Sequence, residues 1–272
     1  MRSFKRLVVI GTLAVALLPA TSAHAALRPR FRVTAHLPAT NVAGQVMRIH
    51  GRVSPHAGGS HVRIRVRAPG ESAFRTLRTA YVHSDGRYHA SITATLPGIT
   101  RYRVVEPAGR GHRKGRSPVE IVTVSRWRTI ASLPRVPGNY NMGTIDAVPT
   151  VNLNGTVYAP GLVQRPSQYF NPGWQEYVVN GKCSRLDTWV GMSPPEPGTP
   201  DSGAGVSIWT GPNDGSQTFT LATGVGVDYY GPPRELTLGP NDLTVAGIIK
   251  LSIDDDHKVP IGWGNPRVLC SF

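Results

Sequence analysis

Strict alternation of apolar and basic residues over positions 61–67 constrains the fold of this chain more than any other feature. The segment reads His-Val-Arg-Ile-Arg-Val-Arg, so Val62, Ile64 and Val66 fall on one side of an extended strand. A period of two places these residues on the buried face of a sheet and the arginines on its wet face. Short runs of this kind recur between turns rich in the chain's 30 glycines and 24 prolines. The pattern predicts an all-β protein.

Residues 1–25 have the composition of a signal peptide. A basic segment precedes an apolar run of about a dozen residues, and Ala23-His24-Ala25 fits the A-x-A cleavage rule. The run is shorter than the roughly 20 residues that a membrane-spanning helix requires. We therefore expect a secreted protein, extracellular or associated with the cell wall, with no membrane span.

The positive charge is concentrated in the first half of the chain. Of the net charge of +14, residues 27–128 hold 19 arginines and lysines against four acids, whereas residues 129–272 hold 8 against 12. A composition break of this size predicts two domains. We place them at 26–125 and 145–272, joined by a linker at 126–144.

The N-terminal half shows about seven short strand patterns, which suits an immunoglobulin-like sandwich. The expected strands are 31–36, 45–53, 61–67, 74–82, 87–95, 99–106 and 118–124. A Gly-x-Val-Ser-Pro strand end at 51–55, an Asp-Gly-x-Tyr turn at 85–88 and Tyr-Arg-Val at 102–104 resemble the Ig-like modules of exported actinobacterial proteins. That resemblance implies a spacer or adhesion unit.

Five arginines are expected on the wet face of this first sandwich. They are Arg63, Arg65, Arg67, Arg101 and Arg103. Two interpretations stay open: adhesion to an anionic polymer, or a solvated sheet face. Few aromatic residues are interleaved with the arginines, so we expect no specific nucleic-acid recognition. The basic segment 109–117 is expected to be a mobile loop.

The C-terminal half predicts a jelly-roll β-sandwich. Strands are expected at 151–153, 156–163, 174–180 and 183–192, followed by a hairpin turning at 213–215 and three later strands. The element order resembles the NPCBM family of carbohydrate-binding modules. The matching positions are Gly155, Tyr158, Gly161, Ser167, the stretch from Leu186 to Gly191, and Trp263. Arg165 stands where the family tends to carry a histidine.

Both cysteines, Cys183 and Cys270, lie in this half. An exported chain meets an oxidising compartment, which favours a disulfide over two free thiols. The bridge would close a loop of 87 residues, for which the chain-entropy model gives roughly 4 to 5 kcal/mol. We interpret the surrounding segment 181–191 as a structural strand rather than an active site.

No catalytic motif stands out, and we do not expect an enzyme. The chain contains no G-x-S-x-G, H-E-x-x-H or P-loop pattern. Candidate sugar-binding residues are Asp256, His257, Trp263, Tyr229, Tyr230 and Arg165, because sugars stack on aromatic rings and need polar partners for their hydroxyls. Trp263 has an equal alternative as a core residue. We assign Trp174, Trp189 and Trp209 to packing.

The run Asp254, Asp255 and Asp256 allows either a solvated turn or a structural calcium ion held by carboxylate oxygens. No other cofactor is expected. The hypothesis is a non-catalytic carbohydrate-binding protein whose partner is a glycan or cell-wall polymer, of galactose type by the NPCBM resemblance. The alternative is a structural or protein-interaction envelope protein whose jelly roll has lost sugar binding.

Overall fold

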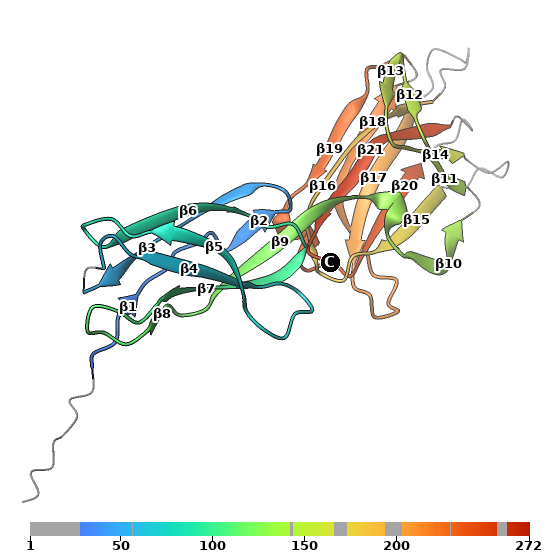
Figure 1. Cartoon of the computed structure of the whole chain (residues 1–272). Coiled ribbons are helices and arrows are strands. Elements are labelled where there is room, and N and C mark those ends of the chain that lie inside the picture. Colours follow the sequence, from blue (N-terminus) through green and yellow to red (C-terminus); the bar gives the residue numbers. More distant parts are fainter. Residues whose placement is uncertain are drawn as a thin grey trace, which may run out of the picture.

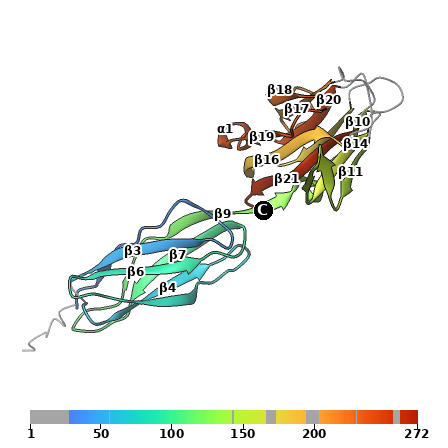
Figure 2. The same cartoon turned by 90° about the horizontal axis from the view of Figure 1, so that it is seen from above.

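The computed structural model describes residues 28–55, 57–141, 144–165, 173–193, 203–228, 230–254 and 260–272. The described chain is all-β and almost entirely antiparallel. Two elongated sandwiches lie end to end, and the C-terminus lies near their junction (Figures 1 and 2). Each sandwich has its own hydrophobic core.

The N-terminal sandwich packs two sheets face to face. One sheet contains β1 (Arg32–Val33), β3 (Val46–Ser54) and β6 (Arg87–Thr93). The other has the order β5 (Arg75–Tyr81), β4 (His61–Arg67), β7 (Gly98–Glu106) and β9 (Glu120–Thr129), with β2 (Thr40–Val42) parallel to β9 and β8 (Gly115–Arg116) beside β7. Ile49, Ile64 and Val104 are fully buried between the sheets. The period-two pattern therefore selects the core as expected.

The C-terminal sandwich also has two sheets. The first contains β11 (Thr144–Val148), β14 (Gly161–Arg165), β21 (Ile261–Cys270), β16 (Cys183–Met192) and β19 (Arg234–Leu238). The second has the order β10 (Arg135–Asn141), β15 (Gly173–Val178), β20 (Ile248–Asp254), β17 (Gly203–Gly211) and β18 (Thr220–Asp228). A small hairpin joins β12 (Val151–Leu153) to β13 (Thr156–Tyr158).

Strand β9 belongs to both sandwiches. Its first part pairs with β7, and its last residues pair with β21, with Trp127 opposite Leu269 and Arg126 opposite Cys270. The segment 126–144 therefore differs from the expected linker: 126–129 continue β9, a short 3-10 turn follows at Ile130–Ser132, and β10 and β11 begin within it. Continuous backbone pairing couples the two sandwiches (Figure 1).

The predicted strands 61–67, 151–153 and 183–192 have the same bounds in the structure. The predicted strand 156–163 is instead two strands, because the chain turns at Ala159 and Pro160, and proline cannot donate to a ladder.

The segment 109–117 is more ordered than a mobile loop. It contains β8, and the Arg113 carbonyl accepts from the Phe31 amide at 3.1 Å. Among the described residues, no helix has the length and apolar character needed to cross a membrane.

The Cys183–Cys270 disulfide is confirmed, with an S–S distance of 1.98 Å between paired positions of β16 and β21. Asp187, in the same strand, is nearly buried. It is ion-paired with Arg185 at 2.7 Å and with Arg267 at 3.4 Å. These contacts fit the interpretation of 181–191 as a structural strand.

Candidate functional site

The outer face of the sheet β10-β15-β20-β17-β18 carries two tryptophans. In β15, Tyr177 is fully buried in the core, whereas Trp174, of opposite parity, is half-buried. In β17, Ile208 is fully buried and the next residue, Trp209, is half-buried. Alternation therefore turns both indoles away from the core and toward the outer face.

Lys250 lies between these tryptophans. It stands on β20, the strand between β15 and β17, opposite Trp209 on one side and Glu176 on the other. Its Nζ lies 4.2 Å from the centroid of the Trp174 ring and 5.2 Å from that of Phe219. Both distances are within cation–π range. The ammonium is therefore held against aromatic rings in the middle of the face.

The electrostatics of Lys250 follow from its half-buried position. Burial lowers the pKa of Lys250 below its usual range, and the neighbouring Glu176 carboxylate partly offsets this effect. The charged form has lost part of its hydration. A ligand oxygen that accepts a hydrogen bond from Nζ would replace the missing water.

Short residues surround Trp174 on the neighbouring strands. Ser252 on β20 lies opposite Trp174, followed across the sheet by Ser207 on β17 and Gly224 on β18. The next outward pair along β17 and β18 is Gly205 and Gly226. The indole Nε1 of Trp209 donates to Ser207 Oγ at 2.8 Å, which fixes that ring. Among the described residues, serine and glycine therefore hold the outer positions between the Trp174 ring and Asp254, which ends β20.

Trp263 does not belong to this face, and its assignment as a sugar platform is wrong. The side chain is fully buried in the core of the C-terminal sandwich. Its Nε1 donates to the Oε1 of buried Gln164 at 3.3 Å. The alternative interpretation, a core residue, is the correct one, because Trp263 has inward parity on β21.

The remaining predicted residues stand at one end of the C-terminal sandwich. Arg165 ends β14 and is ion-paired with Asp146 at 3.0 Å. Asp254 is exposed at the end of β20, and exposed Tyr230 follows the end of β18, with its carbonyl accepting from Asn154 at 2.9 Å. The ion pair of Arg165 therefore goes to Asp146, and the hydrogen bond of the Tyr230 carbonyl goes to Asn154.

The candidates Tyr229, Asp256 and His257 lie outside the described residues, as does Asp255 of the possible calcium site. Within the described ranges, no group of three or more His, Cys, Asp or Glu side chains is arranged to hold a metal. The calcium hypothesis stays a prediction.

Sequence reasoning missed the face that carries Trp174 and Trp209, because it assigned both residues to packing. A usable signal was present. In Val-Ser-Ile-Trp, positions 206–209, the apolar Val206 and Ile208 alternate with Ser207 and Trp209. A tryptophan in register with serine rather than with the aliphatic residues faces outward.

The arginines predicted on the wet face of the first sandwich do lie together. Arg65 pairs with Arg103 and Arg67 pairs with Arg101 across β4 and β7, and Arg63 is the next outward residue on β4. Arg63 is exposed, and the other four side chains are half-buried. The five arginines therefore lie on the outer face of the sheet, as the alternation predicted.

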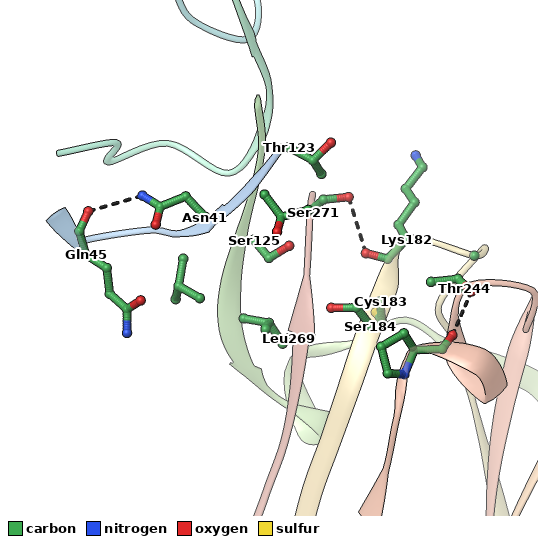
Figure 3. Close-up of a pocket in the computed structure, with 14 residues that line it drawn as sticks. Asn41, Gln45, Thr123, Ser125, Lys182, Cys183, Ser184, Thr244, Leu269 and Ser271 are labelled. Carbon is green, nitrogen blue, oxygen red and sulfur yellow. Dashed lines mark hydrogen bonds between the residues drawn. The ribbon is translucent and has the colours of Figure 1, made fainter. Parts of the chain in front are cut away.

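A cavity of about 550 Å³ lies at the junction of the sandwiches (Figure 3). It is lined by β2 and β9 on one side and by residues of β16, β21 and the helix α1 (Pro240–Leu243) on the other. Several of its polar groups already bond within the protein: Asn41 Nδ2 to the Gln45 carbonyl, Ser271 Oγ to the Lys182 carbonyl and Thr244 Oγ1 to the Pro240 carbonyl. Its lining contains no aromatic ring. It is therefore a weaker ligand site than the aromatic face.

No protein-family model matches the chain, and no curated protein matches its sequence. The resemblances to the NPCBM family and to Ig-like modules therefore stay predictions.

Among solved structures, a family 29 carbohydrate-binding module from Piromyces equi is 8% identical with a TM-score of 0.33, covering 54% of this chain and 91% of that one. The CBM22-1 xylan-binding domain of Paenibacillus barcinonensis Xyn10C is 10% identical with a TM-score of 0.33, covering 52% and 86%. The CBM22-1–CBM22-2 tandem of that protein is 9% identical with a TM-score of 0.32, covering 89% and 94%. These structural neighbours are carbohydrate-binding modules, but at such TM-scores we draw no inference from them.

Proposed function

We propose that this chain is an exported, non-catalytic carbohydrate-binding protein. The observation that carries the proposal is the outer face of the sheet β10-β15-β20-β17-β18. There Trp174 and Trp209 are half-buried on the outer face, on the two strands that flank Lys250. We name this surface the aromatic face, defined by Trp174, Trp209, Lys250, Ser207 and Ser252.

The chemistry of the aromatic face matches that of a sugar ring. The C–H face of a pyranose packs on an indole, and its hydroxyls need donors and acceptors at the ring edge. Lys250 supplies a donor that burial has partly dehydrated, while Ser207 and Ser252 supply hydroxyls. Because the surface extends over three strands, a chain of several sugar units is a better fit than a single sugar.

The rest of the chain has a place in this proposal. The C-terminal sandwich would be a jelly roll of the NPCBM type, with a galactose-containing or cell-wall glycan as ligand. The N-terminal sandwich would be an Ig-like spacer or adhesion module. The disulfide supports export, because such bonds persist in oxidising compartments.

The test is calorimetric titration of the full oxidised chain against soluble galactans, xylans and wall polysaccharides. Trp174→Ala and Trp209→Ala should each weaken binding by about tenfold, which corresponds to the loss of one aromatic stacking contact. The matched control is Trp189→Ala. Trp189 is also half-buried, but it lies on β16 in the other sheet, where it stacks on Tyr158 of the hairpin β12–β13, with ring centroids 5.8 Å apart.

Equal losses in Trp174→Ala and Trp189→Ala would place the glycan elsewhere. Absence of binding across the panel by a folded chain would favour the alternative, a structural or protein-interaction envelope protein. Repeating the titration with calcium and then with a chelator tests the aspartates 254–256. Calcium-dependent binding would put a metal at that end of the sandwich.

A further inference from the structure

The N-terminal sandwich has a second surface on which charge is concentrated. On the outer face of β4 and β7, Arg65 lies opposite Arg103 and Arg67 opposite Arg101. Like charges directly opposite each other on paired strands destabilise a sheet. Among the described residues, none of these four guanidinium groups has a salt bridge within 4.0 Å. An anion from outside the chain would relieve the repulsion.

Phe74 holds part of this arginine array in place. The guanidinium carbons of Arg67 and Arg103 lie 5.3 Å and 4.9 Å from the centroid of its ring. Arg65 donates to the Phe74 carbonyl. These arginines are therefore held in position before any ligand binds. The guanidinium groups of Arg67 and Arg103 cover the Phe74 ring.

Two cavities continue the array toward β8. One, of about 330 Å³, is lined by Arg63, Arg65 and Lys114, together with the hydroxyl-bearing Thr76. The other, of about 390 Å³, is lined by Arg30, Arg113, Lys114 and Arg116. Lys114 lines both, so the cavities adjoin. Neither lining contains a carboxylate.

The packing of the segment 109–117 creates these cavities. Arg116 pairs with Val105, which in turn pairs with Arg63, so the three residues lie side by side across three strands. The Arg113 amide donates to the Pro29 carbonyl at 2.8 Å, and its Nε donates to the Arg28 carbonyl at 2.7 Å. The basic residues of this segment therefore have defined positions next to the arginine array.

We propose that this surface binds a linear polymer that carries a phosphate group in each repeat, with phosphates seated in the two cavities. We name it the basic face, defined by Arg63, Arg65, Arg103, Lys114 and Arg116. The tetrahedral oxygens of a phosphate accept hydrogen bonds from several directions, which fits cavities lined by three or four cations. A planar carboxylate engages fewer converging donors.

The polymer is inferred to lack bases. Single-stranded nucleic acids bind proteins through successive bases stacked on exposed aromatic rings. Next to the arginines lies Phe74, which is half-buried and covered by Arg67 and Arg103. Phe31 lines the second cavity, but its ring is buried and stacked on His112. A phosphodiester-linked polyol chain has the charge that this face requires and no need for stacking. The site is separate from the aromatic face and does not depend on the proposed function.

The test is titration of the full chain with synthetic poly(glycerol phosphate). Polygalacturonate and an oligothymidylate of matched charge serve as competing probes. The double variant Arg63→Gln/Lys114→Gln should weaken poly(glycerol phosphate) binding by roughly tenfold and make its salt dependence shallower. The matched control is Arg32→Gln/Arg48→Gln, because both residues are exposed on the opposite sheet.

The outcomes separate the possibilities. Tighter binding of poly(glycerol phosphate) than of either competitor, lost in the first double variant alone, supports the proposal. Preference for polygalacturonate or oligothymidylate overturns it. Equal losses of poly(glycerol phosphate) affinity in both double variants would show that the polymer is attracted by the net charge alone, and would overturn the proposed site. An unchanged melting temperature confirms that the variants are folded.

Discussion

The outer faces of the two sandwiches are built in the same way and differ in what they display. In both, alternation sends aliphatic residues inward, such as Ile64 in β4 and Leu251 in β20. The outward positions hold arginines in β4 and β7, but tryptophan, lysine and serine in β15, β20 and β17. Since outward residues are not needed for the core, they are free to carry binding chemistry.

The difference also determines the distance over which each surface attracts its ligand. The basic face acts through charge, which steers ligands over a Debye length and is screened by salt. The aromatic face acts through contact, because stacking requires the ligand to touch the rings. Four experiments can break or sharpen this comparison, and each has a distinct expected size.

The largest effect is expected at Trp263, the tryptophan that lies inside. Trp263→Ala should lower the free energy of unfolding of the C-terminal sandwich by about 3 to 5 kcal/mol, because a fully buried ring leaves a cavity. Urea unfolding followed by circular dichroism measures this change. Trp174→Ala should cost less than about 1 kcal/mol. Comparable losses in the two variants would mean that the outer tryptophans are structural.

Removal of the disulfide is expected to have the next largest effect. Cys183→Ala/Cys270→Ala should lower the free energy of unfolding by about 2 to 5 kcal/mol, since the bridge closes a loop of 87 residues. Thermal unfolding with and without reductant measures it, and reduced wild-type protein should match the variant. Glycan binding should persist wherever the variant is folded, as the bridge lies away from the aromatic face. Lost binding by a folded variant would contradict that.

Salt should separate the two faces. Between 50 and 200 mM sodium chloride, poly(glycerol phosphate) binding should weaken by roughly tenfold, because each contacted phosphate releases counterions. Glycan binding on the aromatic face should change by less than about twofold, since stacking is not screened. Parallel calorimetric titrations of one preparation measure both. A glycan affinity that falls as steeply as the polymer affinity would place both ligands on charged residues.

The smallest effect concerns Glu106, at the end of β7 beside the basic segment. Burial raises the pKa of Glu106, while the nearby Ser60 hydroxyl and the charge of Arg110 oppose the shift. The folded state therefore binds its proton more tightly than the unfolded state. Protonation of Glu106 thus contributes to the free energy of unfolding. This contribution is fully present below the pKa of the unfolded state, near 4.5, and is lost as the pH rises through the higher pKa of the folded state.

Glu106→Gln should accordingly raise the free energy of unfolding at pH 7 by about 1 kcal/mol, because one carboxylate oxygen is buried without a partner among the described residues. At pH 4 the difference should be close to zero. Urea unfolding at both values measures it, with Glu120→Gln as the control. A gain of equal size at both pH values would exclude titration as the cause.

The strand pattern was largely predictable from local sequence. The segments 61–67, 151–153 and 183–192 were predicted with the observed bounds, because alternation and turn residues act over short distances. The segment 126–144 was not, since its pairing partners lie far along the chain. Residues 126–129 find β21, more than a hundred residues later, and nothing local signals that partner.

The site was less predictable than the fold. A tryptophan in a strand has two possible faces, and composition does not distinguish them. Trp263 was predicted as either a sugar platform or a core residue and lies in the core, whereas Trp174 and Trp209 were assigned to packing and are half-buried on the outer face. The arginine face was predicted correctly in direction, because charged side chains are rarely buried unpaired.

Local sequence was thus sufficient for the all-β class, the alternation of each strand and the direction of the charged residues, since these depend on neighbours one or two positions apart. The folded chain alone brings β15, β20 and β17 into register, so that Lys250 meets Trp174. It also places Gly115 and Arg116 beside β7, across that strand from β4. Register depends on which distant strands pair and how far each is shifted. Those choices are made by burial of the whole core, which no single segment contains.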